Sequence, residues 1–188
     1  VSIVGEIELA SRWLSGRIVA ITGTKGKSTT TTLTGLMFVA GGLKALVGGN
    51  IGTPLSSQVA DSTPDTFHIV EVSSFQLETS ETFHPWIAVL LNLTADHLDR
   101  HGSMDAYGAA KARIFANQTP DDWAVINADD PQTLARGMVV DLVHPHVGDD
   151  DVKVFGFDQR LAAAAGRRHR AVAADPFEAF RDRLRMCF

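Results

Sequence analysis

A glycine-rich loop between an apolar run and a helix-forming segment constrains the fold of this chain more than any other feature. Residues 18–21 (IVAI) lead into residues 22–29 (TGTKGKST), and a helix is predicted over residues 30–40. A strand, a glycine loop and a helix in this order present backbone N–H groups and a helix N-terminus to a phosphate. Lys27 can reach the terminal phosphates of a nucleoside triphosphate, and the Ser28 hydroxyl can hold Mg²⁺. The loop therefore predicts nucleotide binding without indicating which reaction follows.

The loop departs from the usual phosphate-loop pattern, G-x-x-x-x-G-K-[ST]. Gly26, Lys27 and Ser28 fit its last three positions, but Ile21 stands where the first glycine belongs. The nearest earlier glycine is Gly23, which gives a compressed G-x-x-G-K-S. An ordinary solvated turn is the alternative interpretation. The strand and helix predicted on either side favour the phosphate loop.

Composition excludes several classes of protein. The net charge of −5 over 188 residues argues against a general nucleic-acid-binding surface. The single cysteine, Cys187, rules out a disulfide framework within the chain and fits a cytoplasmic protein. The sequence contains no run of about 18 apolar residues, so we expect no membrane span and no membrane partner. The first residues read like internal sequence, which leads us to expect a fragment.

Predicted strands and helices alternate along the chain. We expect strands at residues 18–21, 45–47, 67–70, 87–93, 123–127 and, more weakly, 152–157. We expect helices at residues 5–14, 30–40, 55–60, 107–117 and 131–136, with Leu33, Leu36 and Met37 on one face of the second. This alternation predicts an α/β fold of three layers, with a mainly parallel sheet and helices on both faces. Beyond Gln159 we find no chemical motif, and a terminal helix is expected.

Polar residues follow two of the predicted strands, where open α/β sheets bind ligands. Glu71 ends the strand at residues 67–70, where an acid that holds magnesium belongs; a strand-end surface acid is the alternative. His97 follows the strand at residues 87–93 and lies between two acids, so either a metal or phosphate role or an ordinary exposed histidine is consistent with the pattern. Lys111 lies on a predicted helix, where a solvated face is the alternative interpretation.

Seven motifs together resemble those of the Mur ligases in order and spacing over residues 5–131. They are residues 5–10 (GEIELA), 21–29 (ITGTKGKST), 48–52 (GGNIG), 71–78 (EVSSFQLE), 92–101 (NLTADHLDRH), 110–114 (AKARI) and 125–130 (VINADD). The compressed glycine loop is normal for that family. The SSFQL run is similar to the branch of the family that adds D-glutamate.

The resemblance implies a three-domain enzyme of which this chain is one part. It implies that residues 1–16 end an N-terminal UDP-binding domain or its linker, and that residues 17–158 form the central ATP-binding domain. It also implies that residues 159–188 are an atypical tail, expected to be helical, and that the C-terminal ligase domain is absent from this chain. The missing N- and C-terminal domains are the expected partners, together with small-molecule substrates.

The resemblance also implies a reaction: ATP-dependent ligation of D-glutamate to UDP-N-acetylmuramoyl-L-alanine through an acyl phosphate, in cytoplasmic peptidoglycan synthesis. It implies catalytic roles for Lys27, Glu71, His97 and Lys111. Mg²⁺ would be held by Ser28 and Glu71, and a second metal by His97 and Lys111, the lysine as a carbamate because an ammonium cannot ligate Mg²⁺. The implied ATP-binding residues are Gly23, Thr24, Lys25, Gly26, Lys27, Ser28 and Thr29. The implied substrate-binding residues are Asn50, Ser73, Gln76 and His97.

Three alternatives remain open at this point. The chain could be an isolated nucleotide-binding fragment without ligase turnover. It could belong to a sister Mur ligase that adds another amino acid, because the choice of amino acid depends largely on the missing domain. A phosphate-loop kinase or a regulatory GTPase is the third alternative, but the chain contains no N-K-x-D motif for reading guanine.

Overall fold

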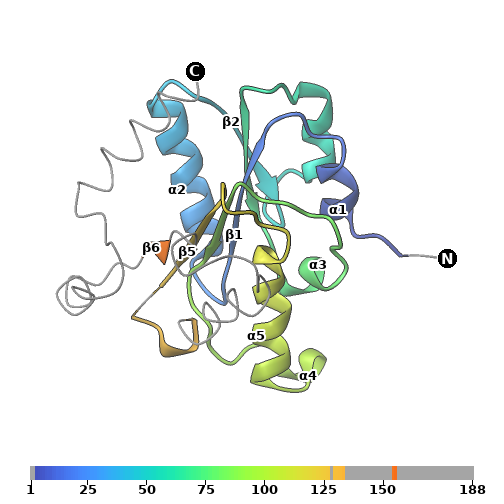
Figure 1. The fold of residues 1–188 in the computed structure, drawn as a ribbon, viewed down its shortest axis with the longest axis vertical. Coiled ribbons are helices and arrows are strands. Elements are labelled where there is room, and N and C mark those ends of the chain that lie inside the picture. The colour runs from blue at the N-terminus through green and yellow to red at the C-terminus, as the bar shows by residue number, and fades with distance from the viewer. Residues whose placement is uncertain (1–2, 128, 134–153, 156–188) are drawn as a thin grey trace. The chain divides into compact units, whose positions relative to one another are not determined.

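The computed structural model describes residues 3–127, 129–133 and 154–155, and these contain one parallel sheet with helices on both faces (Figure 1). Six strands run in the order β2-β3-β1-β4-β5-β6, and every pairing is parallel. The strands are β1 (Arg17–Thr22), β2 (Lys44–Gly49), β3 (Thr66–Glu71), β4 (Ile87–Leu90), β5 (Trp123–Ile126) and β6 (Val154–Phe155). The α/β fold predicted from the sequence is confirmed.

The register of the central strands determines where the site can lie. In β1, Ile21 pairs with Glu71 of β3, and Thr22 pairs with Leu90 of β4. Because parallel strands end at the same edge of a sheet, the residues that follow β1, β3 and β4 meet there. The glycine loop after β1 is therefore flanked on both sides by the polar segments that the sequence analysis selected.

The helices divide between the two faces of the sheet. Figure 1 shows α2 (Lys27–Ala40) on one face, and α1 (Glu6–Ser11), α3 (Ser74–Glu78) and α5 (Met104–Ala112) on the other. The remaining helices are η1 (Leu55–Asp61), α4 (Leu98–His101) and η2 (Arg113–Phe115). A continuous apolar core joins the second face to the helices, with Ile7, Leu55, Leu77 and Phe115 contributed from outside the sheet. None of the helices in the described ranges is long and apolar enough to cross a membrane.

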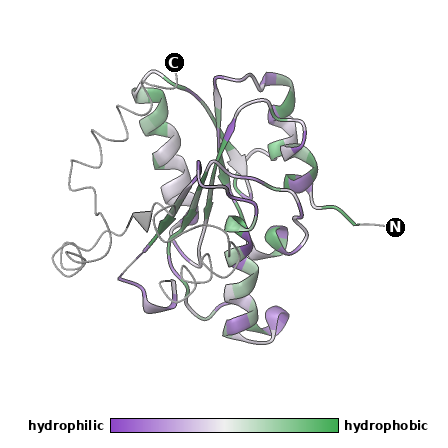
Figure 2. Ribbon diagram, in the orientation of Figure 1, coloured by the Kyte–Doolittle hydropathy of each residue, from purple (hydrophilic) through white to green (hydrophobic). Residues whose placement is uncertain are grey.

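The face of α2 that carries Leu33, Leu36 and Met37 is exposed. Leu33, Leu36 and Met37 are 55%, 62% and 51% exposed, whereas Gly35 and Phe38 are buried. Figure 2 accordingly shows hydrophobic residues over the carboxyl-terminal half of this helix. Phe38 packs edge-on against Phe67, with ring centroids 5.0 Å apart, and Gly35 lies against Val47 of β2 with no room for a Cβ. The helix thus faces the sheet with its small residue and one aromatic ring, and not with its leucines.

Several predicted boundaries also require correction. The second helix begins at Lys27 and not at residue 30, β4 ends at Leu90 and not at residue 93, and the segment at residues 55–60 is the 3-10 helix η1. Helices α3 and α4 were not predicted from the sequence. Residues 131–133 are helical, and the rest of that predicted helix lies outside the described residues, as does the whole tail after Gln159.

The chain divides into two compact units, residues 1–157 and 158–188, and the second lies outside the described residues. Within the first unit, α1 packs against η1 and α3. The domain boundaries predicted at residues 16/17 and 158/159 stay predictions.

A buried carboxylate anchors α1. Glu8 is fully buried, and its oxygens accept hydrogen bonds from the backbone N–H groups of Glu81, Thr82 and Phe83 at 2.9–3.1 Å. The Thr82 hydroxyl and the Arg12 guanidinium complete the set. Burial by itself would raise the pKa of Glu8, but the hydrogen bonds from Thr82, Arg12 and Glu81 outweigh it and lower the pKa to about 2.

We expect Glu8→Gln to lower the free energy of unfolding by about 2–3 kcal/mol, because the amide nitrogen would face backbone N–H donors. The pKa of Glu8 is lowered on folding from 4.5 to about 2. Its charge therefore contributes about 3 kcal/mol of stability above pH 4.5, and this contribution is lost as the pH falls towards 2. Urea unfolding at pH 7 and at pH 3 measures both effects. Glu81→Gln, at an exposed carboxylate nearby, is the control; equal stability of the two variants would contradict the assignment.

Candidate functional site

The glycine loop adopts the conformation that a phosphate site requires. Gly26 lies in the left-handed region, at φ 81°, and α2 begins at the next residue. The first N–H groups of a helix have no partners within the helix, so those at the start of α2 face the concave side of the loop. The Lys27 ammonium folds back and donates a hydrogen bond of 2.9 Å to the Thr24 carbonyl. The loop therefore offers backbone donors and one cation at a single place.

Asn92, which follows β4, holds the loop from the side. Its Oδ1 accepts hydrogen bonds from the N–H groups of Thr24 (3.2 Å) and Lys25 (2.9 Å). Its Nδ2 donates to the Lys25 carbonyl at 2.9 Å, and its own carbonyl accepts from the Thr24 N–H. The Asn92 side chain thus pairs with both N–H and carbonyl groups of the loop. Asn92 was given no role from the sequence, because the predicted strand at residues 87–93 included it and its partners in the loop are distant in sequence.

Glu71 is the buried acid of the site. It is 3% exposed, and its two carboxylate oxygens accept hydrogen bonds from the Ser28 hydroxyl (2.7 Å) and the Asn50 amide (3.0 Å). The Asn50 N–H also donates to the Glu71 carbonyl. Three predicted residues from separate motifs therefore meet. The Ser28 and Glu71 oxygens converge as a hard-oxygen pair that fits Mg²⁺, which takes one or two protein oxygens and keeps its other ligands as water or phosphate.

Lys111 lies on α5 with its ammonium against the end of β1. The residue is 2% exposed; its Nζ donates to the Thr22 hydroxyl at 3.4 Å and lies 4.9 Å from the centre of the Tyr107 ring. Burial lowers the pKa of Lys111 to about 7, and Lys27 lowers it as well, whereas Asp96 and Glu71 oppose the shift. The solvated-face interpretation of this lysine is therefore excluded. A neutral amine is well populated near pH 7.

His97 occupies an exposed and strained position. Its backbone lies in the left-handed region at φ 51°, which is unusual for a residue other than glycine, and its side chain is 50% exposed. The ring lies 5.1 Å from Phe75 and 6.5 Å from Tyr107, between centroids. The described residues contain no group of three His, Cys, Asp or Glu side chains that could hold a metal ion. A metal site at His97 and Lys111 stays a prediction that depends on chemical conversion of the lysine.

Ser73 and Gln76 bind each other. The Ser73 hydroxyl accepts from the Gln76 N–H, and the Gln76 side-chain oxygen accepts from the Ser73 N–H at 3.0 Å. This is a capping box, and it begins helix α3 directly after β3. The S-x-x-Q spacing could have revealed this helix from the sequence. The predicted substrate-binding role of the two residues stays a prediction, with part of their hydrogen-bonding capacity already used.

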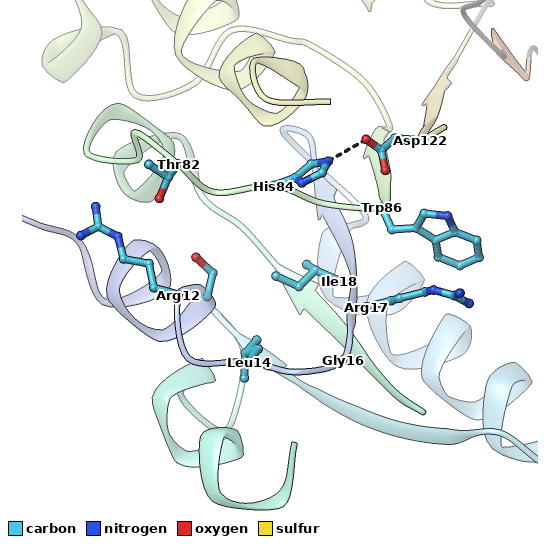
Figure 3. Close-up of a pocket in the computed structure, with 10 residues that line it drawn as sticks. Arg12, Leu14, Gly16, Arg17, Ile18, Thr82, His84, Trp86 and Asp122 are labelled. Atoms are coloured by element: carbon cyan, nitrogen blue, oxygen red, sulfur yellow. Dashed lines mark hydrogen bonds and ion pairs between the residues drawn. The ribbon is translucent and has the colours of Figure 1, made fainter. Parts of the chain in front are cut away.

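A pocket lies on the opposite side of the sheet from the carboxyl ends of the strands (Figure 3). Arg17 begins β1 and Trp86 precedes β4, so this pocket lies at the amino-terminal ends of the strands, away from the glycine loop. His84 pairs with Asp122 at 2.6 Å, and the Arg17 guanidinium lies 5.0 Å from the centre of a Trp86 ring. These groups are largely engaged with one another, and none of the predicted site residues lies there.

The fold and the site together define a phosphate-loop α/β protein in which a buried acid and a buried lysine flank the loop. The sequence profile of the Mur ligase middle domain matches residues 21–153. The chain therefore belongs to the Mur ligase family.

Similar proteins agree with this placement. The chain is 56% identical over 131 residues to the UDP-N-acetylmuramoylalanine–D-glutamate ligase of Pelotomaculum thermopropionicum, which covers 70% of this chain and 29% of that protein. It is 50% identical over 166 residues to the ligase of the same name from Anaeromyxobacter dehalogenans, covering 88% and 34%. The chain thus spans about a third of the length of these relatives.

Solved structures of the family share the fold. A UDP-N-acetylmuramoyl-L-alanyl-D-glutamate–2,6-diaminopimelate ligase superposes with a TM-score of 0.58 at 29% identity, over 75% of this chain and 31% of that one. The MurF ligase of Thermotoga maritima, solved in complex with ADP, superposes with a TM-score of 0.55 at 21% identity, over 80% and 35%. At this identity, the second comparison supports the fold alone.

We expect Asn92→Ala to weaken binding of a non-hydrolysable ATP analogue about tenfold or more, because the variant leaves the N–H and the carbonyl of Lys25 without their partner and removes one of the two acceptors of the Thr24 N–H. Calorimetric titration in the presence of Mg²⁺ measures the loss. Asn117→Ala is a matched control, since Asn117 donates two hydrogen bonds to the carbonyls of Glu81 and Phe83, away from the loop. Equal affinities of the two variants would contradict the role given to Asn92.

Proposed function

We propose that this chain is the ATP-binding part of a ligase that joins D-glutamate to UDP-N-acetylmuramoyl-L-alanine in cytoplasmic peptidoglycan synthesis. The observation that carries the proposal is the meeting of Lys27, Ser28, Glu71 and Lys111 around one phosphate loop in a chain of this family. The names of the relatives at 50–56% identity support D-glutamate as the amino acid. The N- and C-terminal domains of such a ligase would be its partners.

Joining a carboxylate to an amine requires activation of the carboxylate. In the proposed reaction, the carboxylate of the UDP-linked substrate attacks the γ-phosphorus of ATP, and ADP leaves with the bridging oxygen. The amine of D-glutamate then attacks the acyl phosphate, loses a proton and expels inorganic phosphate. Because two anions must approach each other in the first step, positive charge has to be placed between them.

The residues of the loop would serve this first step. Residues Gly23 to Thr29 would surround the phosphates, with the N–H groups of Thr24 and Lys25 held by Asn92 and those at the start of α2 bound to the phosphate oxygens. The Lys27 ammonium would leave the Thr24 carbonyl to stabilise the transferring phosphoryl group. Ser28 and Glu71 would hold Mg²⁺, which neutralises charge on the phosphate oxygens when it is bound. Asn50, Ser73, Gln76 and His97 would line the place of the second substrate.

Lys111 would act as a carbamate. Its buried amine has a pKa of about 7, so a large fraction is neutral at physiological pH and can attack CO₂ through its lone pair. The nitrogen releases a proton to solvent, and the product is a carbamate anion on the same side chain, whose oxygens would be suitable ligands for Mg²⁺ together with His97. The positive charge of Lys27 nearby would favour the anion over the free amine.

A nucleotide-binding fragment without turnover is the second candidate. The observation in its favour is that the chain spans only about a third of the length of its relatives. It predicts magnesium-dependent nucleotide binding by the 188-residue chain and no ligation until the other domains are supplied.

Lys27→Ala in a complete ligase that carries this segment should lower kcat at least about 100-fold, because the transferring phosphoryl group loses its cation. The rate of phosphate release in the presence of both substrates measures the effect. Lys44→Ala is the control, since Lys44 lies on β2 and donates to the Asp61 carbonyl and Thr63 hydroxyl. Near-full turnover of Lys27→Ala would refute the phosphate role.

Removal of CO₂ should lower the activity of the same ligase about tenfold or more, and bicarbonate should restore it. Since only the neutral amine reacts, the rate of reactivation at a fixed CO₂ concentration should rise as the pH passes upward through about 7, the pKa of Lys111. Lys111→Ala should have low activity that bicarbonate does not change. Activity insensitive to CO₂ and retained in Lys111→Ala would sink the carbamate assignment.

A further inference from the structure

Two hydrogen bonds tie helix α5 to the glycine loop and the strand before it. Tyr107 lies four residues before Lys111 on this helix, and its hydroxyl is 3.3 Å from the Thr24 hydroxyl. One turn further on, the Lys111 ammonium donates to the Thr22 hydroxyl. Tyr107 and Lys111 lie about 6.0 Å apart along the helix axis, on the same face of the helix. The two contacts therefore hold the helix at two points, one on the glycine loop and one at the end of β1.

The Thr24 hydroxyl connects three segments, and all of its hydrogen-bonding capacity is used. It accepts from the Thr94 N–H at 3.0 Å and donates to the Thr94 carbonyl at 3.1 Å. A hydroxyl has one proton and two lone pairs, so its remaining lone pair accepts from the Tyr107 O–H. Tyr107 is 1% exposed, and water therefore cannot replace this partner easily. The loop, the segment that leads to His97, and α5 meet at this one oxygen.

We propose that Tyr107 is a positioning residue, whose hydrogen bond to Thr24 sets the place of Lys111 relative to the phosphate loop. The inference rests on the proposed function, because it concerns the geometry between the bound phosphate and Lys111. The ring of Tyr107 packs against His101 at 5.1 Å between centroids and lies under the Lys111 ammonium. These ring contacts need no hydroxyl, so the role of the oxygen is separable from that of the ring.

Loss of the Tyr107 hydroxyl should affect nucleotide binding and turnover differently. The hydrogen bonds from Asn92 and Thr94 hold the loop without any help from Tyr107. Loss of the Tyr107 hydroxyl should therefore leave nucleotide affinity nearly unchanged. It should misplace Lys111, and small misplacements of a reacting or ligating group cost more in rate than in binding.

Tyr107→Phe in the complete ligase tests the proposal. We expect kcat to fall about tenfold, with the affinity for a non-hydrolysable ATP analogue changed by less than about twofold. Assays run well below the melting temperature separate this effect from instability. Ser80→Ala is the matched control, since it removes another buried hydroxyl, which donates to the Leu77 carbonyl away from the loop. It should lower stability and leave kcat unchanged.

A double-mutant cycle with Thr24→Val shows whether the effect passes through Thr24. In the Thr24→Val background, Tyr107→Phe should change kcat by less than about twofold, because the bond is already absent. Full kcat in Tyr107→Phe, or an undiminished tenfold loss in the Thr24→Val background, would overturn the proposal. Absence of ligation by the unmodified enzyme would instead count against the proposed function, so the two failures are distinguishable.

Discussion

The polar groups at the carboxyl edge of the sheet must satisfy one another, and the geometry of the site follows from this constraint. The ends of β1, β3 and β4 meet there, and the loops that leave them cannot use the ladder hydrogen bonds of the strands. Asn92 supplies partners for the glycine loop, and Glu71 receives donors from Ser28 and Asn50. Each of these contacts joins residues more than 20 positions apart, so the site forms only when the sheet has formed.

The sequence predicted the architecture well because its signals were local. Apolar runs gave the strands, and the loop with Gly26 and Lys27 gave the strand–loop–helix unit. The packing of α2 could not be predicted in the same way, since a stripe such as Leu33, Leu36 and Met37 does not show that the sheet prefers Gly35 and Phe38. The prediction that β4 extends to residue 93 was wrong for a related reason. Asn92 and Leu93 hydrogen-bond to the glycine loop and to Asp130, and these partners are distant in sequence.

Residue types identified most of the candidate site, and contacts identified the rest. Lys27, Ser28 and Glu71 stand at positions where a phosphate loop requires them, and the structure brings them together. The burial of Lys111 and the link from Tyr107 to Thr24 depend on how α5 lies on β1, which no local pattern records. Ser73 and Gln76 show the opposite case, since two residues to which the family resemblance gave a substrate-binding role also form a helix cap.

Because Gly35 has no side chain, α2 packs directly against β2, the outermost strand on that side of the sheet. This contact affects the site at the other end of the helix. Gly35 lies seven residues after Ser28 on the same helix, about 10 Å along its axis, and it touches Val47 of β2. A helix moves largely as a rigid rod, so a methyl group at this contact would act as a wedge and tilt the amino end of α2. The loop would then lose its alignment with Glu71 although no residue near it had changed. The alignment of the loop at the amino end of α2 therefore constrains which side chain β2 can carry at Val47.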